Sequence, residues 1–333
     1  MSEENRADEQ GFGKFALIDQ VHNKFRAFFD NNESSNNITN TLYLEGIHFN
    51  LMYFPLKHLG YKAVINSISD LYCRGMQPQA VSVNMGLSVR FKKEDIEEII
   101  EGVCLACDRY ALKISSLDID SSLTGLAISI ASSGKEAEFF ERKTPEATDL
   151  ICVTGDLGAA YLGLQLLERE RKVFEETGGA QPKLEGFEYV IGRQLKPELR
   201  TAEIEELGKA GIEPGIIRTV RDGLASELLH ISKTAALGCR VYHDKLPVAG
   251  ETAAAGRELE FEPFVAALNG GDDFEYVFTC PVREHEKLEK TEGISIIGHL
   301  VPREEGNSLV LQDGSLAELR AQGWEGSPDT PSS

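Results

Sequence analysis

The stretch from Leu42 to Pro78 constrains the fold more than any other part of the chain. A strand-like apolar segment leads through a turn into a helix that carries Asp70 near its end, with Gly75 and Pro78 as stop signals. An aspartate at the end of a helix is more often solvated than functional, so Asp70 gains meaning only from later segments. The residues that share one apolar face of this helix are Ala63, Val64, Ile68, Leu71 and Tyr72.

Strands and helices alternate through both halves of the chain. Strict alternation of apolar residues predicts strands over 80–89 and 123–134, and helical spacing predicts helices over 14–28 and 92–112. A strand, a turn and a helix begin at Asp149, and the segments 196–211 and 216–238 each contain a helix. Four further apolar segments predict strands of a mixed layer, at 239–243, 275–279, 294–298 and 308–312.

Two domains of an α/β (α+β) fold follow from this pattern. Periodicity is lost over 142–149, which places the boundary between an N-terminal domain at 11–148 and a C-terminal mixed α/β domain at 149–324. The polar segment 29–40 is interpreted as a connecting loop, and the charged, then glycine-rich residues 168–190 as a mobile excursion. We expect the tails at 1–10 and 325–333 to be disordered.

Charge and cysteine usage exclude several classes of function. The chain has 54 acidic and 34 basic residues, a net charge of −20, and such a field repels nucleic acid and anionic membranes. No apolar run approaches the length of a membrane span, and the acidic N-terminus lacks the features of a secretory signal, so a cytoplasmic protein with six reduced cysteines is expected. Cys104 and Cys107 form one CxxC inside a predicted helix, where core packing is favoured over zinc.

Two local patterns leave alternatives open. The strand ending at Thr154-Gly155, with Gly158 opening a helix, is typical of a turn that cradles phosphate on free amides, but a plain tight turn fits equally well. Asp222 begins a predicted helix, where an acid suits the helix dipole and an ordinary N-terminal cap is the simpler interpretation.

Eight ordered segments resemble bacterial thiamine-monophosphate kinase, a family within the superfamily of aminoimidazole ribonucleotide synthetase. The resemblance extends from about Gly11 to Trp324. Its segments are LEGIHF, GYKAVINSISDLYCRGMQP, DSSLTG, DLICVTGDLGAAYLGLQLL, LKPELR, RDGLASELLHI, LNGGDDFEYVFT and LRAQGW.

The resemblance implies a two-domain subunit whose N-terminal sheets pair across a homodimer. It also implies Mg2+ and ATP in the groove between domains, and transfer of the γ-phosphoryl group onto thiamine monophosphate to give thiamine diphosphate. Converging carboxylates would hold the metal ions that bring the two phosphates together. Position by position, the resemblance makes Asp70, Asp118 and Asp222 the catalytic metal ligands, and it assigns cofactor binding to Arg142, Gly155, Gly158, Arg221 and Asp272.

The same positions also show departures from the family pattern. The Gly-Asp-Asp-Ala segment expected before LEGIHF is absent, and the acid expected four residues before Glu45 is Thr41. The glycine pair before Asp118 is replaced, so that a leucine side chain stands where bare backbone should approach phosphate. Arg221 replaces a serine, and its guanidinium is expected either to pair with the surviving acids or, less favoured, to stand in for a metal by contacting phosphate. The replaced pair is Ser116 and Leu117.

Three functions therefore stay open at this point. The first is an ATP-dependent phosphotransferase acting on thiamine monophosphate. The second is a catalytically inactive homologue that binds a nucleotide or a thiamine phosphate, or acts as a partner subunit. The loss of carboxylates and glycines from one site, while strands and helices persist, is expected of a protein that has to keep only its fold. The third is a purely structural dimer that binds nothing.

Overall fold

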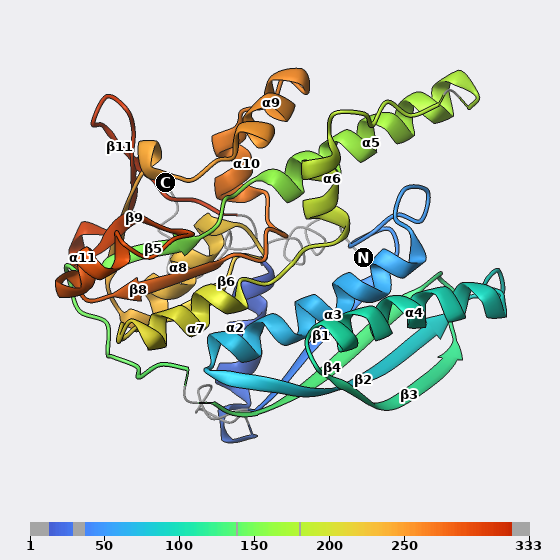
Figure 1. Ribbon diagram of the computed structural model, residues 1–333, viewed down its shortest axis with the longest axis horizontal. Coiled ribbons are helices and arrows are strands. Elements are labelled where there is room, and N and C mark those ends of the chain that lie inside the picture. Colours follow the sequence, from blue (N-terminus) through green and yellow to red (C-terminus); the bar gives the residue numbers. More distant parts are fainter. Residues whose placement is uncertain (1–12, 29–36, 138, 180, 322–333) are drawn as a thin grey trace, which may run out of the picture.

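The computed structural model describes residues 13–28, 37–137, 139–179 and 181–321, and its strands form two sheets. Figure 1 shows the first sheet below and the second, with most of the helices, above. Helix α3 (Leu56–Cys73) lies between them and packs against β1, β2 and β4 of the first sheet and against β6 and α6 of the second half. Within the described ranges, no helix has both the length and the apolar character needed to cross a bilayer.

Helix α3 covers one face of the first sheet. Its strands are β1 (Ile38–Leu44), β2 (Met76–Leu87), β3 (Lys113–Ser121) and β4 (Ala127–Glu136), in the order β1-β4-β2-β3. Strands β2 and β3 are parallel and the other pairs are antiparallel. Val83 and Ile130 are buried on the face that α3 and α4 (Lys93–Arg109) cover, and Asn84 on β2 points to the opposite, open face because successive side chains alternate.

Two glycines let α3 and α4 approach closely. A Cβ atom on Gly60 of α3 would lie 2.1 Å from the carbonyl oxygen of Ile99, and one on Gly102 of α4 would lie 1.9 Å from that of Lys57. Neither position accepts a side chain unless the two helix backbones move apart. This contact fixes the position of α3 and therefore of the polar residues that it carries.

The second sheet is mixed and is buried on both faces in its middle. Its strand order is β11-β10-β7-β9-β5-β8-β6, with only β10 and β7 parallel. Strand β5 (Leu150–Thr154) sends Ile151 and Val153 toward α8 (Leu224–Ala235) and Cys152 toward the other side. The remaining strands are β6 (Ile217–Thr219), β7 (Gly238–Tyr242), β8 (Tyr276–Cys280), β9 (Ile294–Val301), β10 (Asn307–Val310) and β11 (Leu316–Glu318).

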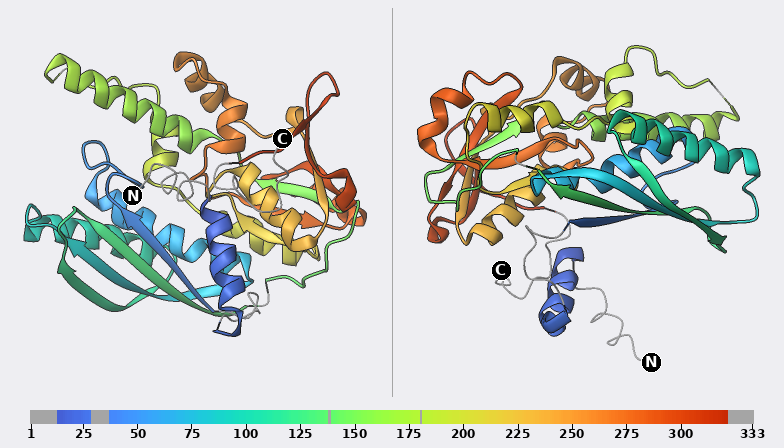
Figure 2. Two further views of the ribbon diagram at one scale, coloured as in Figure 1. Left: turned by 180° about the vertical axis from the view of Figure 1, so that it is seen from behind. Right: turned by 60° about the horizontal axis from the view of Figure 1, so that its bottom comes forward.

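Helices of the second half surround this sheet. They are α5 (Ala159–Thr177), α6 (Glu188–Leu195), α7 (Thr201–Lys209), α8, α9 (Gly250–Glu258), α10 (Pro263–Asn269) and α11 (His285–Leu288). The N-terminal helix α2 (Lys14–Lys24) docks on α8 and lies on the side of the first sheet away from α3 and α4 (Figure 2).

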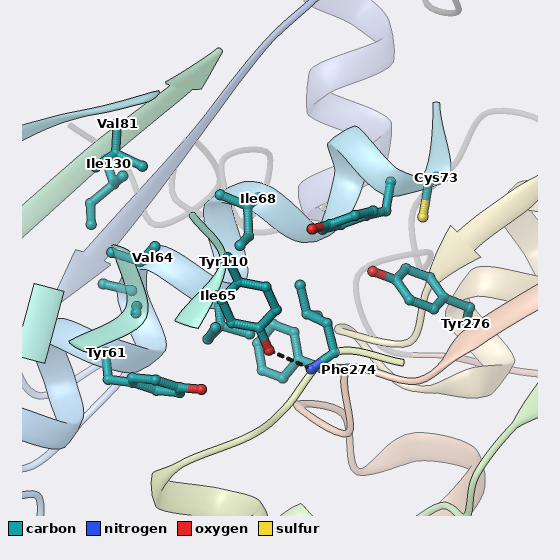
Figure 3. Close-up of a cluster of buried hydrophobic side chains, with 14 of the residues drawn as sticks. Tyr61, Val64, Ile65, Ile68, Cys73, Val81, Tyr110, Ile130, Phe274 and Tyr276 are labelled. Carbon is teal, nitrogen blue, oxygen red and sulfur yellow. Dashed lines mark hydrogen bonds between the residues drawn. The ribbon is translucent and has the colours of Figure 1, made fainter. Parts of the chain in front are cut away.

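One hydrophobic cluster joins the two halves of the chain. Ile65 and Ile68 of α3 pack in it together with Phe274 and Tyr276 from the second half. Figure 3 shows these side chains facing one another, with Val81 and Ile130 of the first sheet on the far side of α3. The two sheets are therefore tied together through α3 by apolar burial, the main source of stability in such a contact.

Most sequence predictions of elements are confirmed, two are corrected, and one strand is missed. The predicted α/β class, the helices near 14–28 and 92–112 and the four later strands are all present. Much of the segment 168–190 is helical, because α5 continues to Thr177 and α6 begins at Glu188. The segment 29–40 was assigned to a loop, but β1 already begins at Ile38, and β3 was not predicted at all. The predicted tails lie outside the described residues, and the division at 148 and 149 stays a prediction.

Candidate functional site

Helix α3 and two loops of the second half bring charged side chains together. The loop after β6 carries Arg221 and Asp222, and the loop before β8 carries Asp272. The two loops are joined by backbone, since the amide of Asp272 donates to the carbonyl oxygen of Arg221 at 2.8 Å. Gly271 has a φ of +78°, and a Cβ atom there would lie 2.4 Å from that same carbonyl oxygen, so this junction requires glycine. Six residues form what we call the interdomain ion pairs: Lys14, Lys62, Asp70, Arg221, Asp222 and Asp272.

Arg221 is the centre of the interdomain ion pairs. Its Nη1 donates to Oδ2 of Asp70 at 3.2 Å and to Oδ1 of Asn66 at 3.1 Å, both on α3, and its Nε lies 3.6 Å from Oδ2 of Asp222. The carboxylate of Asp70 raises the pKa of Arg221, and that of Asp222 adds to the effect. Together they outweigh burial, which acts to lower this pKa. Of the two roles considered for Arg221, the structure therefore has it pairing with the surviving acids.

Asp222 has a second cationic partner on α2. The ammonium group of Lys14 donates to Oδ1 of Asp222 at 2.9 Å. Burial alone would raise the pKa of Asp222, but Lys14 and Arg221 outweigh it and hold this pKa below its ordinary value. Helix α2 reaches this position because it docks on α8, where Phe15 packs edge-on against His230 with ring centroids 4.5 Å apart.

Lys62 pairs with Asp272 from inside the protein. Its side chain is 1% exposed, and its ammonium group lies 2.9 Å from Oδ2 of Asp272. The same group donates to the backbone carbonyl of Gln194 at 2.7 Å and to Oε1 of that residue at 3.2 Å. All three protons of the ammonium group therefore have acceptors, as a buried charge requires.

Asp118 does not join the interdomain ion pairs. It lies on β3, opposite Asn84 of β2, on the open face of the first sheet, whereas α3 covers the other face. There it lines a cavity of about 220 Å³ together with Asn84 and Leu42. Its carboxylate accepts a hydrogen bond from the amide of Ile119 at 3.0 Å. Within one chain, the structure thus unites Asp70 and Asp222 and leaves Asp118 apart.

The glycine turn before α5 holds a carboxylate of the protein itself. Oδ2 of Asp273 accepts from the amide of Gly158 at 2.8 Å, and Oδ1 accepts from the amide of Ala160 at 3.3 Å. The amide of Gly155 donates to the carbonyl of Gly293. A phosphate at this helix N-terminus would have to displace Asp273, so the observed turn has the geometry of an internally capped helix. Binding of a cofactor by Gly155 and Gly158 stays a prediction.

Burial dominates the ionisation of the acids beside this turn. It raises the pKa of Asp273 to about 7, although Arg193 and the two amides act in the opposite direction. Burial also raises the pKa of Glu275, whose carboxylate is bonded to Arg193 at 2.8 Å and to Arg200 at 3.1 Å. These residues form a closed structural network between β8, α6 and the start of α7.

Arg142 also serves to join the two halves. Its guanidinium donates to the backbone carbonyl of Cys73 at the end of α3 and, at 3.3 Å, to that of Gly215 in the second half. Burial lowers the pKa of Arg142. The predicted contact of Arg142 with a cofactor is not tested by these bonds, which show the side chain engaged by backbone.

The residues present do not fit a magnesium site. Among the described residues, no group of three or more His, Cys, Asp or Glu side chains is arranged to hold a metal ion. Asp70, Asp222 and Asp272 are each bonded to a lysine or an arginine of the chain. Thr41, where the family pattern has an acid, is partly buried, and its hydroxyl has no hydrogen-bond partner in the described structure. A hard divalent cation requires free oxygen ligands, and these carboxylates are already engaged.

Sequence reasoning missed the cations that complete the interdomain ion pairs. Lys62 offered a signal, because a lysine inside an otherwise apolar run of a helix must find acceptors if that run is buried. Lys14 offered none, since its partner Asp222 is 208 residues away and only the docking of α2 brings them together.

Comparison with known proteins shows that the chain is similar to thiamine-monophosphate kinases. Residues 29–135 match the family described as AIR synthase related protein, N-terminal domain. The thiamine-monophosphate kinase of Aquifex aeolicus (strain VF5) is 27% identical over 289 residues, which cover 86% of this chain and 87% of that protein. The thiamine-monophosphate kinase of Bacillus subtilis (strain 168) is 25% identical over 290 residues, covering 84% and 85%.

A solved structure agrees with this likeness. AaThiL complexed with AMPPCP and TMP superposes with a TM-score of 0.78 at 22% identity, covering 94% of this chain and 96% of the other. At this level of identity, the superposition establishes the fold. The chain is thus similar to thiamine-monophosphate kinases over most of its length and shares the fold of AaThiL, and its residues 29–135 match the N-terminal domain of the AIR synthase related proteins.

Proposed function

We propose that the protein is an ATP-dependent phosphotransferase of the thiamine-monophosphate kinase type, which converts thiamine monophosphate and ATP into thiamine diphosphate and ADP. The observation that carries this proposal is the likeness to thiamine-monophosphate kinases over 86% of the chain. ATP and thiamine monophosphate are then its small-molecule partners, and AaThiL was solved with AMPPCP and TMP. A cytoplasmic location suits both substrates.

The interdomain ion pairs are where we place the reaction. An oxygen of thiamine monophosphate attacks the γ-phosphorus of ATP while the bond to the β-phosphate oxygen breaks, and the electron pair leaves with ADP. The attacking oxygen is already an anion, so the protein mainly positions the two phosphates and neutralises their charge. Arg221 and Lys14 carry the positive charge available for this purpose, and each must exchange a carboxylate for a phosphate oxygen.

We further propose that two copies pair through the open face of the first sheet. Strand β1 exposes Ile38 and Leu42 on that face, where their side chains are 55% and 53% exposed. A second copy would cover these apolar side chains and the cavity that Asp118 lines. Sedimentation equilibrium should give twice the 36.7 kDa of one chain, and a monomer at all concentrations would refute the pairing.

One observation favours a second function, which is ligand binding without turnover. Three carboxylates of the interdomain ion pairs are matched by three cations of the chain, so phosphate must compete with them. Competition of this kind weakens the electrostatic stabilisation of the transition state on which phosphoryl transfer depends.

Incubation of the full chain with ATP and thiamine monophosphate decides between the two. The phosphotransferase should yield thiamine diphosphate and ADP in equal amounts by chromatography, and Arg221→Gln should lower the rate because it removes a cation that would neutralise the phosphates. Product no greater than in a blank without protein would refute catalysis. Calorimetric titration with each substrate would then test the second function, which predicts binding without product.

A further inference from the structure

The chain supplies cations at the two carboxylates where the family resemblance implies metal ligands. One guanidinium, that of Arg221, contacts both Asp70 and Asp222, at 3.2 Å and 3.6 Å. Lys14 adds a second positive charge at 2.9 Å from Asp222. Two negative and two positive charges therefore cancel at this place, and a divalent cation gains little from approaching it.

Independent contacts hold both cations in position. The guanidinium of Arg221 also donates a hydrogen bond to Asn66 on α3, and its backbone carbonyl oxygen accepts one from the amide of Asp272. Both its side chain and its backbone are therefore held in place. Lys14 belongs to α2, which docks on α8 through an ion pair of Lys233 with Asp19 in addition to the ring contact of Phe15. A tethered charge acts at a high effective concentration, which a free ion in solution has to exceed.

We propose that Lys14 and Arg221 take the place of a divalent cation at Asp70 and Asp222, so that this chain's interdomain site holds no metal ion of its own. This proposal rests on the proposed function, because it concerns the same site at which phosphoryl transfer is placed. Phosphate oxygens at this site are met by an ammonium and a guanidinium group, and any divalent cation that takes part arrives bound to the nucleotide.

Titration of the full chain with Mn2+ alone, followed by the loss of the electron paramagnetic resonance signal of free Mn2+, tests this proposal. The probe is the metal without nucleotide, compared between wild type and the double variant Lys14→Gln, Arg221→Gln. Lys93→Gln is the matched control, because it also removes a cation paired with a carboxylate, that of Glu97 on α4, but leaves the interdomain ion pairs and the docking of α2 intact. Asp222→Asn, added to each protein, identifies the Mn2+ bound at this place rather than elsewhere on an acidic surface.

The expected result is a site gained only by the double variant. Wild type and Lys93→Gln should show no Mn2+ binding that Asp222→Asn removes. The double variant should bind one additional Mn2+, with an affinity at least about tenfold (1.4 kcal/mol) above any Asp222-dependent binding in wild type. Asp222→Asn should remove this additional Mn2+. Circular dichroism confirms folding, and where the double variant does not fold, Lys14→Gln is judged on the same terms, since the Lys14 side chain is 58% exposed.

Three outcomes would overturn the proposal. These are an Asp222-dependent Mn2+ in wild type, a folded variant that gains no such site, and an equal gain in Lys93→Gln. None of them bears on the phosphotransferase activity, because no nucleotide is present in the titration. Conversely, a failure to form thiamine diphosphate would refute the proposed activity and leave the metal result standing.

Discussion

Replacement of Gly102 with alanine tests the contact that positions α3. A Cβ atom at Gly102 would lie 1.9 Å from the carbonyl oxygen of Lys57 and 3.0 Å from the amide nitrogen of Tyr61, whereas ordinary contacts begin at 3.4 Å. Both atoms belong to backbone, so no rotamer change relieves the clash and the helices must separate by about 1.5 Å. Overpacking of this kind costs about 3 kcal/mol or more, and the higher helix propensity of alanine returns about 1 kcal/mol. We expect a net loss of about 2–4 kcal/mol in the free energy of unfolding.

Gly192→Ala is the matched control for this variant. Gly192 lies within α6, and a Cβ atom there meets nothing within 4 Å, so alanine should raise stability by about 0.5–1 kcal/mol. Urea unfolding of the full chain, followed by far-ultraviolet circular dichroism, measures both changes. The reasoning is refuted if Gly102→Ala unfolds within about 0.5 kcal/mol of wild type, or if the control loses as much stability as Gly102→Ala.

Three further predictions follow from burial. Lys62→Met keeps the length of the side chain but leaves Asp272 and the carbonyl of Gln194 without their donor, and should lower the free energy of unfolding by about 1.5–3 kcal/mol. A loss below about 0.5 kcal/mol in urea unfolding would contradict the contacts of the ammonium group. The folded state raises the pKa of Asp273 to about 7 from 3.8, so it retains a proton that the unfolded state releases, and stability should fall as pH rises from about 4 to 7. Asp273→Asn should flatten that fall, which amounts to at most about 1.4 kcal/mol per pH unit for one proton, and an unchanged slope would be the contrary result. Cys104 is exposed and the other five cysteines are buried, so a thiol reagent should modify one thiol of the native protein quickly, and Cys104→Ser should abolish that phase.

The sequence predicted those features that depend on residues close to one another along the chain. The helix around Asp70 was identified from its period and its stop signals, and the pairing of Arg221 with surviving acids was favoured on charge alone. The assumed single apolar face of that helix was an underestimate, because α3 is buried almost all round from Leu59 to Cys73. The second half of the chain covers the remaining faces, and periodicity carries no information about a partner so distant in sequence.

Long-range placement explains the parts of the site that were not predicted. Asp118 was grouped with Asp70 and Asp222 by resemblance, yet β3 is exposed along its whole length and carries Asp118 on the open face of the sheet. Its residues lack the clear apolar alternation that identified β2, so neither the strand nor its direction was recognised. Lys14 reaches Asp222 only through the docking of α2 on α8, a contact that no local pattern encodes.

Because the two sheets share one apolar cluster, the chain cannot be cut between its halves without exposing apolar surface. A fragment cut near residue 148 would keep α3 but lose Phe274 and Tyr276, which cover it, and would present that surface to water. Neither half is then a module that recombination or truncation can transplant alone. We therefore expect the two halves to unfold together, and insertions to be tolerated at loop tips rather than at the contact between the halves.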